Sequence, residues 1–272
     1  MYYAQRLYNF PLGVFGIALG TALFTYFSAC AGRKDHIGLV ETLVKGLRQV
    51  AFIGIAATVG LIILSRPTVE FILGGGLSGI VGIGPGEFGP EAVPRVTSTL
   101  AFYCLGIWAY CGVNVVARGF YALQDTMTPV KIGAWLVALN IPLNTILIWP
   151  LRVGGLALAT AICASLNFVI LAWLLQQKII KLTEGAGQAS QVAARGALRE
   201  AARSLPKIVL ATALMAGAAY VAMTLAGRWF GTAVQQSGIR LAFGLGAGLV
   251  VFYLAAKLLG CKELAELMGK DS

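Results

Sequence analysis

The sequence is 272 residues long, with 58% hydrophobic residues, 12% charged residues and a formal net charge of +10. Ordinary soluble domains contain roughly 45–50% apolar and about 25% charged residues, and one core of this size cannot bury so much apolar surface. The composition therefore excludes an ordinary soluble protein and predicts helices that cross a membrane. The basic residues lie between apolar blocks, not on a soluble face interleaved with aromatics, which argues against a nucleic-acid partner.

Seven apolar blocks each approach the roughly 20 residues that a helix needs to cross a bilayer. We therefore predict an all-α polytopic membrane protein with about seven transmembrane helices. The predicted spans, in chain order, are about residues 7–27, 47–64, 96–117, 132–149, 155–175, 208–226 and 241–259.

Polar and Gly/Pro-rich segments separate these blocks. Residues 37–46 are expected to form an amphipathic lead-in to the second span, which is predicted to stop at Ser65-Arg66-Pro67. The Gly/Pro-rich residues 74–94 predict turns and irregular chain. The three predicted units are residues 1–180 with five spans, residues 181–207 as a cytoplasmic amphipathic connection, and residues 208–272 with the last two spans and a short charged tail.

The connection between the fifth and sixth spans carries a basic stripe. Arg195, Arg199 and Arg203 recur every four residues, so they share one face of a helix. Such a helix either lies on an anionic leaflet or simply connects the two spans through solvent. Membrane lipids are therefore one expected partner.

The basic residues also predict the orientation of the chain in the cell (inner) membrane. With the C-terminus and alternate connections on one side, that side holds 15 of the 21 Lys and Arg residues and the other holds 6. Because basic loops stay in the cytoplasm, the C-terminus is predicted to be cytoplasmic and, with seven spans, the N-terminus external. An external N-terminus without a signal peptide suggests that a further segment normally precedes this chain.

One stripe on the first predicted span combines a cation with small residues: Arg6, Asn9, Gly13, Gly16 and Gly20 follow each other at spacings of 3, 4, 3 and 4. Glycines at this spacing are typical of a seam where helices pack closely. An arginine near the membrane either extends to the interface or points into a water-filled cavity and binds an anion. Its planar fork suits a phosphate, to which it can donate two parallel hydrogen bonds.

A second polar segment, residues 117–131, follows the third span. We expect Asp125 to cap a turn and Pro129 to lie in the first turn of the fourth span. Arg118 and Asp125 are a candidate ion pair. By its chemistry alone, this segment is a structural loop.

The fourth span contains Asn140, Pro142 and Asn144 near its middle. Proline removes a backbone hydrogen bond and kinks a helix. The kink is either a bending point, as transporters use, or a fixed bend held by interhelical amide hydrogen bonds.

Motifs for hydrolysis, metal binding or nucleotide binding are missing from the sequence. The one histidine, His36, lies in a polar connection, and no acidic pair falls inside a predicted span. We therefore expect no catalytic residue, no metal site and no cofactor, and a transporter or an accessory membrane subunit in place of an enzyme.

Three stretches together resemble the MurJ/MviN family of lipid II flippases, within the multidrug/oligosaccharidyl-lipid/polysaccharide exporter superfamily. The order and spacing of the stretches match the family, and the resemblance covers essentially the whole chain. The stretches are YYAQRL (2–7) running into PLGVFGIALGT (11–21), the loop RGFYALQDTMTPVK (118–131), and GGLALAT (154–160).

The resemblance implies that this chain corresponds to only part of a larger transporter. The resemblance implies that a full-length family member has fourteen helices, in two six-helix lobes plus two C-terminal helices. This chain matches helices eight to fourteen. Its implied partners are a missing N-terminal half and lipid II, the undecaprenyl-diphosphate-linked peptidoglycan precursor that the family moves by alternating access for cell wall synthesis. The last two predicted spans match the helices thought to form a groove for the lipid tail.

The resemblance also suggests roles for single residues. Arg6 matches the C-lobe arginine of a set that engages the diphosphate, and Asn9 and Gly13 share its face as further substrate-binding candidates. The candidate structural or gating residues are Gly16, Gly20, Arg118, Asp125 and Pro142.

One residue departs from the family pattern: Gln5 stands where an aspartate usually precedes the arginine. Loss of that carboxylate removes a group that can balance the charge of Arg6. Two alternatives stay open. The chain either belongs to an exporter of another polyprenyl-linked glycan, a drug or a cation, or is a truncated subunit that transports nothing.

Overall fold

A computed structural model of the chain describes residues 2–11, 13, 18–33, 36–73, 92–184, 188–230 and 237–267. Within these ranges the regular elements are helices and no strand occurs, which confirms the predicted all-α class. The helices are α1 (Tyr2–Pro11), α2 (Ala18–Gly32), α3 (His36–Leu73), α5 (Ala92–Cys104), α6 (Ile107–Ala122), α7 (Met127–Leu151), α8 (Val153–Glu184), α9 (Gln188–Phe230), α10 (Ser237–Leu258) and α11 (Lys262–Leu267).

Six stretches of the described residues are long and apolar enough to cross a membrane. They overlap the second to seventh spans that the sequence predicts. The stretches are Glu41–Ile72, Ala92–Ala122, Met127–Leu151, Val153–Lys181, Arg203–Trp229 and Ser237–Leu258.

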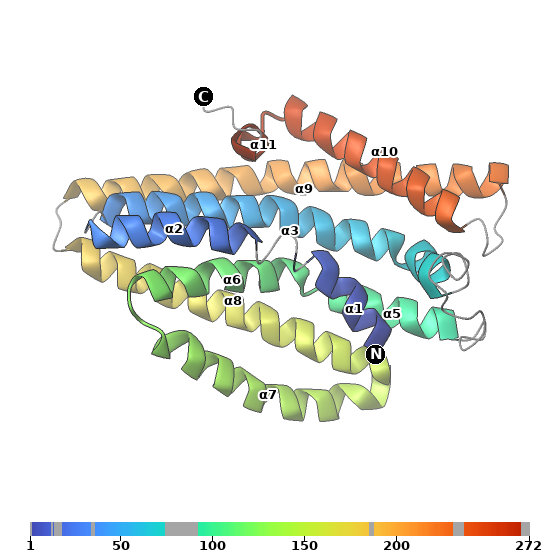
Figure 1. Ribbon diagram of the computed structural model, residues 1–272, viewed down its shortest axis with the longest axis horizontal. Coiled ribbons are helices and arrows are strands. Elements are labelled where there is room, and N and C mark those ends of the chain that lie inside the picture. The colour runs from blue at the N-terminus through green and yellow to red at the C-terminus, as the bar shows by residue number, and fades with distance from the viewer. Residues whose placement is uncertain are drawn as a thin grey trace.

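Helix α3 lies at the centre of the bundle. Helices α2, α5, α6, α9 and α10 all pack against it, α9 pairs with α10, and α7 packs mainly on α8 (Figure 1). The main core includes Val115 and Val116 of α6 and Leu171 and Leu175 of α8, all of them almost completely buried. The long helices therefore run side by side, as expected for a membrane bundle.

Small residues bring α10 close to its neighbours. A Cβ atom added to Gly244 would lie 2.8 Å from Leu64 Cδ2 of α3, and one added to Gly248 would lie 3.4 Å from the Cβ of Ala219 on α9. Such close contacts give helices in lipid the van der Waals packing that holds them together. The α9–α10 hairpin is thus closely fitted to α3.

Helix α7 presents a broad apolar surface away from the bundle. Trp135, Val137, Ile141 and Ile146 are each at least 60% exposed, and Trp149 is 85% exposed. Water would oppose so large an apolar face, whereas lipid chains solvate it at little cost. This face therefore supports the membrane assignment.

The first predicted span, residues 7–27, is not described as one helix. Apart from Gly13, its described residues belong to α1 and α2, which lie at an angle to each other in Figure 1. Helix α1 packs against α5, whereas α2 packs against α3 and α6. The two halves of the expected stripe therefore belong to different helices.

The predicted stop at Ser65-Arg66-Pro67 is wrong, because α3 continues through Pro67 to Leu73. Proline removes one backbone donor, and nearby side chains stabilise the turn around it. The Ser65 hydroxyl donates to the carbonyl of Ile62 at 2.7 Å, and Arg66 pairs with Glu70 one turn later at 2.8 Å.

The third predicted span, residues 96–117, is longer than expected and is interrupted. A turn at Leu105 and Gly106 separates α5 from α6, and α6 continues to Ala122. The N–H of Gly106 donates to the carbonyl of Tyr103, three residues back, at 3.0 Å. A Cβ at Gly106 would lie 3.1 Å from the Cα of Ala161, so a close approach to α8 coincides with the break.

The basic connection and the sixth predicted span form one helix, α9, with Pro206 inside it. The structure therefore does not separate them at residue 207, and in Figure 1 α9 is one long rod beside α3. The irregular loop predicted at residues 74–94 lies outside the described residues, apart from Ala92 to Pro94, which begin α5.

Candidate functional site

Helix α1 has one buried face and one exposed face. Tyr8 is buried and stacks on Tyr103 of α5, with ring centroids 4.9 Å apart and planes 7° apart, and Tyr110 of α6 lies 6.1 Å away. Arg6 and Asn9 are both exposed. The tyrosine stack fixes the rotation of α1, so that it presents Arg6 and Asn9 on the other face.

The described glycines of the predicted stripe differ in their surroundings. Gly13 is half-buried, with no neighbouring atom within 4 Å of a Cβ added to it. Gly16 lies outside the described residues. Gly20 is buried on α2, where a Cβ would lie 2.8 Å from Nε of Arg118. The structure thus brings Gly20 and Arg118 together, although they belong to two separate sequence motifs.

Asp125 joins the α6–α7 turn to α8. Its Oδ2 lies 2.6 Å from Nζ of Lys178, and Lys178 also lies over the ring of Phe120 at 5.9 Å. The N–H of Thr128 donates to Oδ1 at 3.1 Å, and the Thr128 hydroxyl donates to Oδ2 at 2.8 Å. The expected capping role of Asp125 is confirmed, whereas the ion pair that it forms is with Lys178 and not with Arg118.

These contacts lower the pKa of Asp125 from its ordinary value of 3.8 to about 2, chiefly through the hydrogen bond from Lys178. A carboxylate with a depressed pKa contributes stability above its unfolded pKa, and this contribution is lost as the pH falls from about 4 through about 2. We expect Asp125→Ala to lower the free energy of unfolding at pH 7 by about 1–2 kcal/mol.

Thermal unfolding of the purified protein in detergent checks this prediction. The difference between the variant and the wild type should be largest at pH 7 and should shrink at pH 3. Asp125→Asn, which retains a side-chain acceptor for Thr128, should lose less stability. Equal melting temperatures for wild type and Asp125→Ala at pH 7 would contradict the assigned contacts.

The polar residues of α7 form a short chain of hydrogen bonds. Asn144 Nδ2 donates to Asn140 Oδ1 at 2.6 Å, and Asn140 Nδ2 lies 3.4 Å from Sγ of Cys163 on α8. Pro142, between them, is exposed, and α7 is visibly curved in Figure 1. Asn140 thus makes an interhelical contact of the kind that a fixed bend would use.

Two ionic clusters at α3 were missed by sequence reasoning. Glu263 of α11 pairs with Arg48, and Glu70 pairs with Arg66 and with Arg240 of α10. Charged residues border both ends of the apolar run in α3, but this signal does not identify partners 170 and 215 residues away. In the described part of the chain, no group of three His, Cys, Asp or Glu residues is arranged to hold a metal ion.

Comparison with known proteins shows which family this chain resembles. The family model described as lipid II flippase MurJ matches residues 1–239. A relative from Vibrio cholerae serotype O1, named probable lipid II flippase MurJ, is 30% identical over 263 residues, which cover 96% of this chain and 45% of that protein. A relative of the same name from Thermotoga maritima is 26% identical over 269 residues, covering 99% of this chain and 47% of that protein.

A solved structure, titled lipid II flippase MurJ in an inward closed conformation, superposes with a TM-score of 0.67 at 21% identity. The match covers 94% of this chain and 46% of that one, so it shows a shared fold. This chain spans about half the length of the curated relatives it matches. From the family model and the shared helical fold we conclude that the chain belongs to the MurJ family.

Proposed function

We propose that this chain is part of a lipid II flippase, which moves undecaprenyl-diphosphate-linked peptidoglycan precursor across the cytoplasmic (inner) membrane by alternating access. The observation that carries the proposal is the family match, which extends over residues 1–239. The relatives from Vibrio cholerae and Thermotoga maritima are both called probable lipid II flippases. Six membrane-crossing stretches and a transporter family favour transport over enzymatic chemistry.

A second polypeptide or a preceding segment supplies the other half of the transporter in this proposal. The chain provides a C-terminal lobe in residues 1–180 and a final helix pair in residues 208–272, with residues 181–207 as the cytoplasmic connection between them. The 15-to-6 division of basic residues supports a cytoplasmic C-terminus. The final pair, formed by α9 from residue 208 onward and by α10, is then the place for the lipid tail.

The diphosphate of the substrate is assigned to the exposed face of α1. Arg6 donates to the phosphate oxygens, Asn9 lies one turn further along the same face, and Gly13 leaves room nearby. Arginine suits this role because it stays charged and presents a planar fork of donors. The residue before Arg6 is the uncharged Gln5.

The structural and gating candidates lie at helix contacts. Gly20 lets α2 approach Arg118, Asp125 ties the α6–α7 turn to α8, and Pro142 marks the bend in α7. Gly16 is included with them from its position in the glycine stripe. None of these candidates is assigned direct contact with the substrate.

Complementation tests this function. The part of the Vibrio cholerae relative outside the match is joined in front of this chain, and the resulting fusion is expressed in cells depleted of their own flippase. We expect the fusion to restore growth and the chain alone to fail. Failure of a membrane-inserted fusion would contradict the proposal. Accumulation of a different lipid-linked glycan in the inner leaflet would point to another exporter of the superfamily.

A further inference from the structure

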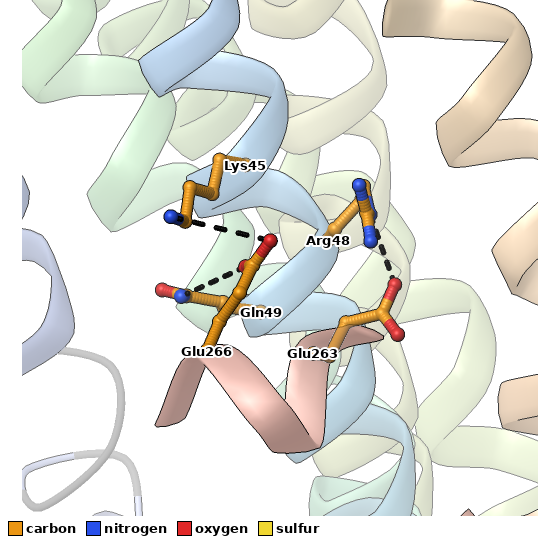
Figure 2. Close-up of polar contacts among 5 residues, drawn as sticks. All are labelled: Lys45, Arg48, Gln49, Glu263 and Glu266. Carbon is orange, nitrogen blue, oxygen red and sulfur yellow. Dashed lines mark hydrogen bonds and ion pairs between the residues drawn. The ribbon is translucent and has the colours of Figure 1, made fainter. Parts of the chain in front are cut away.

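The C-terminal helix α11 folds back onto α3, and carboxylates of α11 face basic and amide side chains of α3 (Figure 2). Arg48 Nε donates to Glu263 Oε1 at 2.9 Å. Arg48 is only 8% exposed and Glu263 is completely buried. Separation of this pair removes the Arg48 contact from the buried Glu263 carboxylate, so the contact resists opening.

A second carboxylate of α11 flanks this pair. Gln49 Nε2 donates to Glu266 Oε2 at 3.4 Å, and Lys45 Nζ lies 4.0 Å from Glu266 Oε1. The Lys45 side chain is 48% exposed, and ion pairs in contact with water contribute little. Arg48 and Glu263 are therefore the principal polar attachment of α11.

An apolar cluster beside this ion pair joins α3, α9 and α10. Phe52 of α3, Ile208 of α9, Ala256 of α10 and Cys261 form a buried group. The rings of Phe52 and Phe252 are 4.8 Å apart. Because Cys261 immediately precedes α11, release of α11 removes apolar surface from this cluster as well as breaking the ion pair.

A separate ionic cluster attaches α10 to α3 at the opposite end. Glu70 of α3 is buried and contacts Arg66 at 2.8 Å and Arg240 of α10 at 3.5 Å. Arg48 and Glu70 are about 22 residues apart on one helix, or about 33 Å at 1.5 Å per residue. This separation is close to the roughly 30 Å thickness of the bilayer hydrocarbon, so the two clusters mark opposite membrane faces.

We propose that α11 is a latch that ties the C-terminal end of α10 to α3 through Glu263 and Arg48. Together with the contact between Arg240 and Glu70, the latch attaches the α9–α10 hairpin to α3 at both ends. The hairpin and α3 therefore move as one body, whatever conformational change the rest of the bundle undergoes. Neither the latch nor its test depends on the proposed transport function.

Cys261 reports on the latch because it is buried beside α11. Burial raises the pKa of its thiol, and the nearby Glu263 carboxylate raises the pKa further. Arg48→Gln is the informative variant, because it breaks the pair without removing that carboxylate. In membranes holding the full chain, we expect N-ethylmaleimide to modify Cys261 at least about tenfold faster in Arg48→Gln than in the wild type.

Mass spectrometry of each cysteine provides internal controls. Cys104 and Cys111 are buried in the main core and should stay equally slow in both proteins. Lys257→Gln removes an exposed charge in the last turn of α10 and should leave the rate at Cys261 unchanged. A wild-type rate at Cys261 in Arg48→Gln overturns the latch, as does equal acceleration at Cys104 and Cys111, which indicates general unfolding.

A charge exchange separates the ion pair from side-chain size. Arg48→Glu combined with Glu263→Arg should return Cys261 to slow modification, whereas either change alone should leave the thiol reactive. Fast modification in the combined variant would overturn the ion pair as the basis of the latch. Because the readout is chemical labelling, a failure of transport in the complementation test leaves this result unaffected.

Discussion

Replacing Arg6 by alanine abolishes growth of flippase-depleted cells that depend on the fusion carrying this chain. Loss of a charge-assisted contact to the diphosphate costs about 1.5–3 kcal/mol, or roughly 10- to 150-fold in affinity for the substrate. Arg6 is exposed on α1, so its removal leaves the packing of Tyr8 on Tyr103 in place. Plating efficiency, with membrane levels of each variant checked by immunoblot, measures the effect.

Two further variants show whether the guanidinium itself matters. Arg6→Lys should support weak growth, because lysine keeps the charge but lacks the planar fork. Arg228→Ala removes another exposed arginine, which the orientation count places on the same membrane side, and should grow normally. Full growth of Arg6→Ala would contradict the role of this residue in substrate binding.

Replacing Gly155 by alanine destabilises the hairpin formed by α7 and α8. The turn passes through Arg152, which has a φ of +49°, and the Gly155 N–H donates to the Arg152 carbonyl at 3.1 Å. A Cβ at Gly155 collides with the backbone carbonyl of Leu147 and lies 3.2 Å from the backbone nitrogen of Ile148. A backbone obstacle cannot rotate away, so we expect a loss of about 1–3 kcal/mol, roughly 2–12 °C in melting temperature.

Gly133→Ala is the matched control for this prediction. Gly133 lies inside α7, and no neighbouring atom is within 4 Å of a Cβ added there. Alanine favours a helix over glycine by about 1 kcal/mol, so this variant should melt at or above the wild-type temperature. Comparable melting of Gly155→Ala and Gly133→Ala would contradict the close backbone contact between Gly155 and Leu147.

The apolar blocks predicted the positions of the membrane-crossing helices but not the residues at which those helices begin and end. Six blocks coincide with membrane-crossing stretches, since length and hydropathy are properties of the local sequence. Pro67 and Pro206 were expected to fall at or outside span ends, yet both lie inside long helices. Proline costs one hydrogen bond, and packing of α3 against α9 and α10 outweighs that local preference.

The candidate site was predictable only where neighbours in sequence are neighbours in space. Asp125 caps the turn next to it, as expected, but its ionic partner Lys178 comes from another helix. The approach of Gly20 to Arg118 and the pairing of Arg48 with Glu263 likewise depend on helix packing. Spacing along one chain predicts shared faces, whereas contacts between helices require the fold.

The location of lipid II in the two leaflets tests the central claim most directly. Cells that depend on the fusion are treated from outside with an enzyme that cleaves lipid II, and the cleaved fraction of newly made lipid II is measured. The proposed function predicts extensive cleavage with the wild-type fusion and protection of lipid II with Arg6→Ala. Protected lipid II in cells with a correctly inserted wild-type fusion would contradict a role for this chain in lipid II transport.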